Sequence, residues 1–142
     1  MRPASVHSGD TGAVEALVLL VEDDRSIRDV TRMGLSDAGF TVVTAGDGEE
    51  ALGIVRRETV HVLLMDMHMP KLTGLETLRL VKRIKALMPC IILSADLNDL
   101  LIEQARRARA FYVLAKPVTR NQITGAVHEA LATAYNWRIV RR

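Results

Sequence analysis

The sequence contains little of what stabilises or specialises many small proteins. It has one cysteine, Cys90, among 142 residues, so it cannot form an internal disulfide or a zinc site built from several thiolates. This cysteine usage predicts a reducing, cytoplasmic setting. We interpret Cys90 as a small core residue, because a free cysteine usually packs like an apolar side chain.

Long apolar segments are also missing. The longest run, residues 16–21, is far shorter than the ~20 residues that a membrane-spanning helix needs, so we expect no membrane association. Residues 1–14 lack the apolar core of a secretory signal and are predicted to form a flexible leader. One folded domain is expected over residues 15–136, followed by a tail over residues 137–142 in which Trp137 could cover the edge of the core or serve a docking surface.

The two halves of the chain differ in charge. Residues 1–66 contain 6 Lys and Arg against 12 Asp and Glu, whereas residues 67–142 contain 13 against 5, which gives net charges of −6 and +8. A basic half suggests nucleic acid as a partner. The basic residues nevertheless stand singly or in pairs on stretches of helical period, without interleaved aromatic residues, as on solvated helix faces. We therefore expect no direct nucleic-acid binding.

What the chain does contain is an alternation of short apolar runs with longer stretches of helical period. The runs are too short for helices and are rich in Val, Ile and Leu, as strands buried on both faces are. Five strands are predicted, over residues 17–21, 41–45, 62–65, 90–93 and 111–114. Because parallel strands are joined by right-handed helical crossovers, the pattern predicts an α/β fold with a doubly wound, five-stranded parallel sheet.

Local signals predict where several helices begin and end. Capping boxes, in which two side chains satisfy the free N–H groups of the first turn, are predicted for Asp47 with Glu50, Thr73 with Glu76 and Thr119 with Gln122. Gly39 stands where a left-handed residue would end the first helix. The apolar positions are Ile27, Val30 and Leu35 in the first helix, and Ile123, Ala126, Val127, Ala130, Leu131 and Ala134 in the last.

Polar residues stand at the carboxyl ends of four predicted strands, where open α/β sheets bind their ligands. They are Glu22, Asp23 and Asp24 after the first strand, Asp66 after the third, Ser94 after the fourth and Lys116 just beyond the fifth. Grouped carboxylates repel each other unless a cation lies among them, and oxygen ligands suit Mg²⁺. Mg²⁺ beside an ammonium and a hydroxyl can stabilise a phosphoryl group. Since the chain has no P-loop, a carboxylate is the expected phosphoryl acceptor.

The order of these residues resembles the receiver domain of two-component response regulators. The motifs are Glu22-Asp23, Asp66-Met67-His68-Met69-Pro70 with Gly74 beyond, Ser94-Ala95 and Lys116-Pro117, and the intervals between Asp23, Asp66, Ser94 and Lys116 are 43, 28 and 22 residues. The resemblance covers about residues 15–136. It implies a flavodoxin-like fold with strand order 2-1-3-4-5 and five helices.

The resemblance also implies roles for the residues. Asp66 would accept a phosphoryl group from a histidine kinase or a phosphotransfer protein. Ser94 would hydrogen-bond the acyl phosphate, and Lys116 would pair with a phosphoryl oxygen. The Lys116–Pro117 peptide bond would be cis.

A magnesium site is implied at the same place. Asp23, Asp66 and the backbone carbonyl of His68 would bind Mg²⁺ directly, and Glu22 would act through a metal-bound water. The acidic run leaves a second register open, in which Asp23 and Asp24 form the acidic pair. We favour Glu22 with Asp23, because the residues that follow then fit the first helix.

Several positions depart from the family pattern or vary within it. Val113 stands where the family usually has an aromatic switch residue, so output is expected to use Tyr112 or the loop after the fourth strand. Arg109 stands where the family commonly has glycine. His68 and Asp96 occupy positions associated in the family with phosphoryl lifetime, and the alternative is that both are solvated rim residues. A partner is expected on the face that carries Tyr112, Arg106, Arg107 and Arg120.

These observations predict a stand-alone receiver that is phosphorylated on Asp66 and signals by changing its affinity for a downstream protein, with homodimerisation on phosphorylation as a further possibility. It would catalyse only its own phosphorylation and dephosphorylation. One alternative is a receiver-like scaffold that works without phosphate. The other is a small Mg²⁺-dependent aspartyl-phosphate phosphatase of the haloacid dehalogenase type, which is disfavoured because His68 replaces the second acid of its motif.

Overall fold

Five parallel strands form one sheet in the computed structural model, which describes residues 16–136. The strands are β1 (Leu17–Val21), β2 (Thr41–Ala45), β3 (Val62–Asp66), β4 (Cys90–Ser94) and β5 (Tyr112–Ala115), and their order in the sheet is β2-β1-β3-β4-β5. The predicted fold class and strand order are therefore confirmed. The expected leader, the expected tail and Trp137 lie outside the described residues.

The strand boundaries differ slightly from those predicted. Asp66 and Ser94 do not follow β3 and β4 but are their last residues. Asp66 is paired with Leu93, and Ser94 is paired with Ala115. The fifth strand begins and ends one residue later than predicted. Hydrogen bonding to the neighbouring strand thus extends the sheet into the polar residues that an apolar pattern leaves out.

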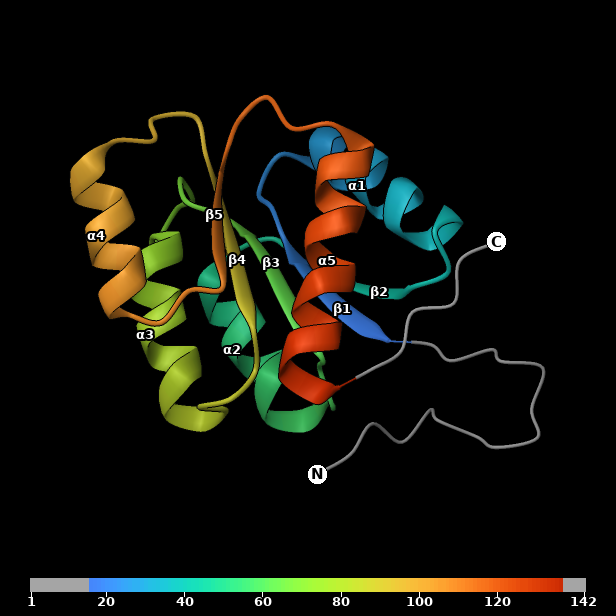
Figure 1. Cartoon of the computed structure of the whole chain (residues 1–142), viewed down its shortest axis with the longest axis horizontal. Helices are drawn as coiled ribbons and strands as arrows, with labels where there is room; N and C mark the ends of the chain where they lie inside the picture. Colours follow the sequence, from blue (N-terminus) through green and yellow to red (C-terminus); the bar gives the residue numbers. More distant parts are fainter. Residues whose placement is uncertain (1–15, 137–142) are drawn as a thin grey trace.

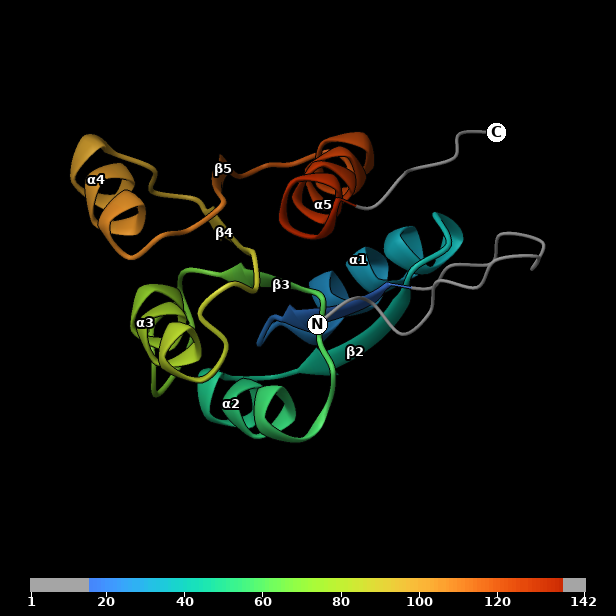
Figure 2. The same cartoon turned by 60° about the horizontal axis from the view of Figure 1, so that its bottom comes forward.

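Four helices join the strands, a fifth follows β5, and the helices cover both faces of the sheet (Figures 1 and 2). They are α1 (Arg25–Asp37), α2 (Gly48–Arg57), α3 (Gly74–Ile84), α4 (Asp99–Arg107) and α5 (Arg120–Tyr135). Helices α1 and α5 pack on one face, whereas α2 and α3 pack on the other. Among the described residues, no helix is long and apolar enough to span a bilayer.

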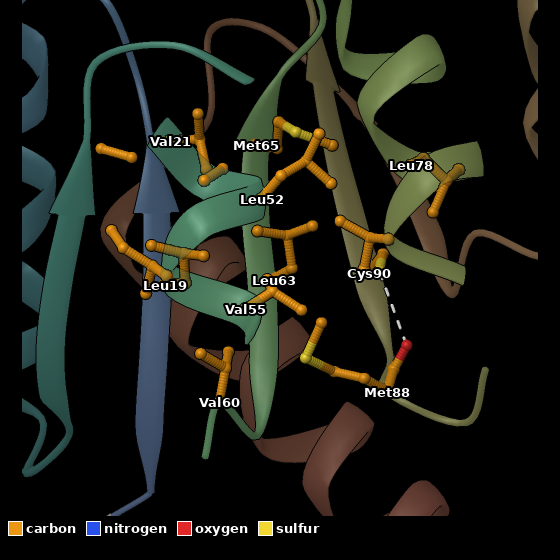
Figure 3. Close-up of a cluster of buried hydrophobic side chains, with 14 of the residues drawn as sticks. Leu19, Val21, Leu52, Val55, Val60, Leu63, Met65, Leu78, Met88 and Cys90 are labelled. Atoms are coloured by element: carbon orange, nitrogen blue, oxygen red, sulfur yellow. Dashed lines mark hydrogen bonds between the residues drawn. The ribbon is translucent and has the colours of Figure 1, made fainter. Parts of the chain in front are cut away.

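Alternating side chains on the strands form two cores, one on each face. On one face, Leu19 and Leu63 from the sheet contact Val55 of α2 and Leu78 of α3, and all four are completely buried (Figure 3). Cys90 belongs to this core, where burial raises the pKa of its thiol to about 12 and its Sγ donates to the Met88 carbonyl. This confirms the interpretation of Cys90 as a core residue.

Two of the three predicted capping boxes are confirmed, at Thr73 with Glu76 and at Thr119 with Gln122. The third prediction is only half right. Asp47 accepts a hydrogen bond from the Glu50 N–H at 2.9 Å, but the Glu50 carboxylate accepts from the Gly46 N–H at 2.7 Å rather than from Asp47. The loop before α2 brings the Gly46 N–H within reach of this side chain, so it satisfies a different free donor.

The first helix ends as predicted but exposes two of its apolar residues. Gly39 has a φ of 98°, and its N–H and that of Phe40 close the last turn on Ser36 and Leu35. Leu35 is buried in the second core, but Ile27 and Val30 are 46% and 67% exposed. Neither residue packs in one of the two cores; both line a cleft beside Leu20, Leu93 and Ile123.

Candidate functional site

Three charged side chains meet at the carboxyl ends of β1, β3 and β5. Glu22 and Asp66 are 4% and 5% exposed. The Lys116 Nζ lies 2.5 Å from the Asp66 Oδ1 and 3.5 Å from the Glu22 Oε1. One ammonium group therefore offsets two buried carboxylates, which would otherwise repel each other and favour the uptake of a proton.

Glu22 is held in place by its own backbone and by the start of α1. Its Oε2 accepts a hydrogen bond from the Asp24 N–H at 3.0 Å, and its carbonyl accepts from the Arg28 Nη1 at 2.9 Å. Burial raises the pKa of the Glu22 carboxyl, and the negative charge of Asp66 adds to this, whereas the Asp24 N–H and the Lys116 ammonium lower it. The site is thus built so that an added positive charge would stabilise the ionised form of Glu22.

The acidic residues could hold a divalent cation. One carboxylate oxygen from each of Glu22, Asp23 and Asp66 lies within 4.8 Å of the others. The Asp66 Oδ1 is buried and receives no aligned hydrogen bond, so the Lys116 ammonium is its charged neighbour. Oxygen ligands of this kind, with coordination left over for water, fit Mg²⁺.

The geometry favours one of the two registers left open by the sequence. Asp24 is the N-cap of α1, and its Oδ1 accepts a hydrogen bond from the Ile27 N–H at 3.1 Å. Its carboxylate is therefore used in starting the helix. Asp23 is exposed, and its carboxylate lies with those of Glu22 and Asp66. These placements support Glu22 with Asp23 as the acidic pair.

A backbone hydrogen bond joins Ser94 and Lys116 at the carboxyl ends of β4 and β5. The Lys116 N–H donates to the Ser94 carbonyl at 2.9 Å, and the completely buried Ser94 Oγ accepts from the Asp96 N–H at 3.1 Å. The Lys116–Pro117 peptide bond is cis, as the resemblance implies. Burial lowers the pKa of Lys116, but Asp66 and Glu22 raise it by more, so the ammonium stays charged at neutral pH.

The loop between β3 and α3 packs against the backbone of Asp66 at Gly74 and contacts the start of α2 through Lys71. A Cβ atom at Gly74 would lie 2.7 Å from the Asp66 carbonyl oxygen, so only glycine allows this approach. The exposed Lys71 lies 3.4 Å from both Asp47 and Glu49 at the start of α2. Gly74 belongs to the motif seen in the sequence, whereas no sequence signal links Lys71 to acids more than 20 positions away.

His68 and Asp96 meet across the mouth of the site. The His68 Nε2 lies 3.3 Å from the Asp96 Oδ2, and both side chains are exposed. His68 follows β3 and Asp96 follows β4, so the contact bridges the two loops that flank Asp66. The two positions singled out from the family pattern are therefore a pair in space.

An apolar cleft opens beside Asp66. It has a volume of about 640 Å³ and runs between α1 and the segment that joins β5 to α5. Ile27 and Val30 line it on one side, and Pro117 and Val118 line it on the other. The two exposed apolar residues of α1 thus border the site rather than a protein core.

The expected partner face carries a different aromatic arrangement from the family pattern. Val113 packs against the core, whereas the Tyr112 hydroxyl donates a hydrogen bond to the Glu129 carboxylate on α5. This bond, together with burial and the Glu129 charge, raises the pKa of Tyr112. The other expected residues of this face are paired with acids: Arg106 and Arg107 with Glu103, and Arg120 with Asp37.

Comparison with known proteins shows relatives that are longer than this chain. GlrR of Escherichia coli K12, a transcriptional regulatory protein, is 31% identical over 128 residues, which cover 87% of this chain and 29% of that protein. NtrC of Salmonella typhimurium LT2, a DNA-binding transcriptional regulator, is 34% identical over 116 residues, which cover 82% of this chain and 25% of that protein. The chain thus spans less than a third of the length of these relatives.

Solved structures match over almost their whole length. The chemotaxis protein CheY4 of Vibrio cholerae has a TM-score of 0.79 and 29% identity, covering 82% of this chain and 99% of that one. A response regulator receiver domain from Clostridium thermocellum has a TM-score of 0.77 and 33% identity, covering 83% and 95%. Residues 18–128 match the family model of the response regulator receiver domain. Receiver domains bind Mg²⁺ at an acidic pocket, and an acidic cluster stands at that place here. The chain belongs to the response regulator receiver domain family, a family of signalling domains.

Proposed function

We propose that this chain is a phosphorelay receiver in which Asp66 accepts a phosphoryl group from a histidine kinase or a phosphotransfer protein. The observation that carries the proposal is the buried Asp66 carboxylate with the Lys116 Nζ at 2.5 Å. A buried acid at the carboxyl edge of the sheet, facing a fixed ammonium, is suited to carry the extra negative charge of a phosphoryl group.

The transfer is a displacement at phosphorus. A carboxylate oxygen of Asp66 attacks the phosphorus of a phosphohistidine, the P–N bond breaks, and its electron pair goes to the imidazole nitrogen. The product is an acyl phosphate on Asp66. Lys116 then pairs with a phosphoryl oxygen, and the Ser94 hydroxyl, which accepts the Asp96 N–H in this structure, is free to donate its own proton to another.

The residues around Asp66 could hold a metal ion that balances their negative charge. Mg²⁺, held directly by Asp23, Asp66 and the His68 carbonyl and through water by Glu22, would supply positive charge next to the transferred group. The closeness of the Glu22, Asp23 and Asp66 carboxylates and the burial-raised pKa of Glu22 both support this assignment. Within the chain, Lys116 supplies the remaining positive charge.

The donor protein would dock on the apolar cleft beside Asp66. Ile27 and Val30 on α1 are exposed at 46% and 67% and line this cleft together with Pro117. A donor that covers them excludes water from the phosphoryl group during transfer, since apolar contact at the rim leaves no room for solvent.

The output face would lie around β5 and α5. The Tyr112–Glu129 hydrogen bond joins β5 to the exposed face of α5. Because β5 is paired with β4, whose last residue is Ser94, movement of Ser94 toward a phosphoryl group can change this contact. Phosphorylation would shift the population between two arrangements of the face that carries Tyr112, Arg106 and Arg107, and a downstream protein would bind one of them.

His68 and Asp96 would set how long the phosphoryl group lasts. Their side chains lie 3.3 Å apart across the loops that flank Asp66. A bridge at this place restricts the approach of a hydrolytic water. Separating the pair, by Asp96→Ala, is expected to shorten the lifetime of the acyl phosphate.

Intact-mass spectrometry after incubation with acetyl phosphate and Mg²⁺ tests the proposal. We expect one added phosphoryl group on the wild type, none on Asp66→Asn, and none when the metal is chelated. Asp99→Asn, which removes an exposed acid at the start of α4, is the matched control and should be phosphorylated like the wild type. An adduct that persists in Asp66→Asn would overturn the assignment, and no adduct with any donor would favour the phosphate-independent scaffold.

A further inference from the structure

Arg109 has a backbone conformation that glycine adopts without strain and other residues adopt at a cost. Its φ is 67° at the end of α4. The Arg109 N–H bonds to the Arg106 carbonyl at 3.0 Å, and the Ala110 N–H bonds to the Ala105 carbonyl at 2.9 Å, which is the hydrogen-bond pattern that favours glycine at this position. A strained residue away from the chemistry is a reason to look for a function.

Arg109 is also placed near another cation. Strands β4 and β5 start side by side, since the Phe111 N–H donates to the Cys90 carbonyl at 2.7 Å, so the connections before them are neighbours (Figure 1). Lys82, on α3, donates to the Met88 carbonyl at 2.8 Å in the connection before β4. Burial lowers the pKa of Lys82, and the positive charge of Arg109 lowers it further, although Cys90 opposes the shift.

The same corner carries two more cations and an exposed leucine. Arg83 and Lys85 are exposed at the end of α3, and Leu87 in the following connection is 87% exposed. Within residues 16–136, none of the cations at this corner has a carboxylate at ion-pair distance, whereas Arg106 and Arg107 nearby both pair with Glu103. The positive charge of this corner is therefore not balanced by a neighbouring acid among the described residues, and Leu87 adds an exposed apolar side chain to it.

We propose that this basic corner, formed by Lys82, Arg83, Lys85, Leu87 and Arg109, binds an acidic segment of a partner protein through its charge and through apolar contact with Leu87. A glycine in place of Arg109 would remove both the backbone strain and the repulsion of Lys82, so the arginine is not explained by the stability of the domain alone. The corner lies at the amino ends of the strands, opposite Asp66, and the inference does not depend on the proposed phosphorylation.

A protein partner fits the corner better than a nucleic acid. The described residues of the corner include no aromatic side chain on which a base could stack, and the exposed Leu87 makes no favourable interaction with a phosphate backbone. An acidic segment with an apolar residue can contact both kinds of side chain, the cations through charge and Leu87 through apolar packing.

A titration of the ¹⁵N-labelled chain with a twelve-residue peptide of alternating Glu and Leu tests the proposal. We expect chemical-shift changes concentrated in residues 82–88 and 108–110. Arg109→Gly and Leu87→Ser should each weaken binding about 3- to 5-fold, which is the size expected of one partly exposed contact. Arg109→Lys, which keeps the charge, should bind like the wild type. Arg57→Gln is the matched control, because Arg57 is an exposed cation at the end of α2.

Three results would overturn the proposal. The first is binding that Arg109→Gly and Arg57→Gln weaken equally, which would show only a general charge effect. The second is shift changes elsewhere on the chain or no binding of the peptide. The third is binding of a DNA duplex or of phosphatidylserine vesicles that depends on Arg109 while the peptide does not compete, which would identify a different class of partner.

Discussion

The Lys116 ammonium lies between the carboxylates of Asp66 and Glu22, at 2.5 Å from the first and 3.5 Å from the second. Two buried acids therefore share one counter-charge. Without a bound cation, the site has more negative than positive charge. The pKa of Glu22 is accordingly raised, by burial first and by the charge of Asp66 second. Charge balance at this site would therefore link the stability of the domain to any cation that binds there.

Glu22→Gln is expected to stabilise the metal-free domain and to weaken Mg²⁺ binding. The amide keeps an oxygen for the Asp24 N–H but removes a buried charge, so we expect the free energy of unfolding at pH 7 to rise by about 1 kcal/mol. The folded-state pKa of Glu22 is raised from 4.5, so between this raised value and pH 4.5 the folded wild type binds more protons than the unfolded chain. The difference in unfolding free energy between the variant and the wild type should therefore narrow as pH falls toward 4.5. Urea unfolding followed by circular dichroism measures both.

Added Mg²⁺ should reverse the order of the two proteins. A ligand that binds only the folded state stabilises it more the more tightly it binds, so the wild type should gain more unfolding free energy than Glu22→Gln. Asp29→Asn, an exposed acid on α1, serves as the control and should change neither quantity. A metal-free Glu22→Gln less stable than the wild type would show that the carboxylate stabilises the fold.

Gly74→Ala is expected to disturb Asp66 directly. The new Cβ would lie 2.7 Å from the Asp66 carbonyl oxygen and 2.9 Å from the Met67 Cα, both backbone atoms that cannot move independently. We expect a loss of about 1 to 3 kcal/mol in unfolding free energy and a lower yield of phosphorylation with acetyl phosphate.

Gly125→Ala is the matched control for this substitution. Gly125 lies inside α5, and a Cβ atom added there would have no neighbouring atom within 4 Å, so alanine should stabilise the helix by about 0.5 to 1 kcal/mol. If both substitutions shift the unfolding midpoint in the same direction, close approach at Gly74 is not what requires glycine there.

The sheet was predictable from the sequence because its strands are buried on both faces and therefore appear as continuous apolar runs. The polar residues at the strand ends were predictable for a related reason, since a charged residue directly after such a run lies at the edge of the sheet. Asp66 and Ser94 show the limit of this argument. Both are paired strand residues, and pairing depends on a neighbour that the local pattern does not contain.

Contacts between loops could not be predicted. The His68–Asp96 pair joins residues 28 positions apart, and Lys71 reaches the start of α2, so each depends on how two loops are placed by the finished sheet. The exposure of Ile27 and Val30 is a similar case. An apolar residue at a helical spacing gives the same signal whether it faces the core or an open cleft.

Arg109→Gly is expected to stabilise the domain by about 0.5 to 1 kcal/mol, because glycine adopts positive φ without strain. Arg109→Ala separates strain from charge: it removes the guanidinium but keeps the Cβ atom at a φ of 67°. Thermal and urea unfolding of the three proteins should therefore place Arg109→Gly above Arg109→Ala. Equal stabilisation by both substitutions would mean that repulsion of Lys82, rather than backbone strain, is the cost at this position.

His61 gives the last prediction, because it is a buried titratable group at the amino end of β3, far from Asp66. Its Nδ1 accepts a hydrogen bond from the Leu17 N–H at 2.9 Å, and the Tyr135 hydroxyl donates to its carbonyl at 2.7 Å. Burial lowers the pKa of His61 below its usual 6.5, so the folded state holds the neutral ring while the unfolded chain takes up a proton near pH 6.5. Its contribution to stability is present in full above pH 6.5 and is lost as pH falls.

His61→Asn should flatten this pH dependence. The asparagine oxygen can replace Nδ1 as the acceptor for Leu17 but does not titrate, so the wild type should lose stability more steeply than the variant between pH 7 and pH 5. Urea unfolding at half-unit intervals over this range gives the two slopes. The comparison cancels the titration of Glu22 and the other acids, which both proteins share. Parallel slopes would mean that His61 takes up a proton equally well in the folded and the unfolded chain. Its burial would then not lower its pKa.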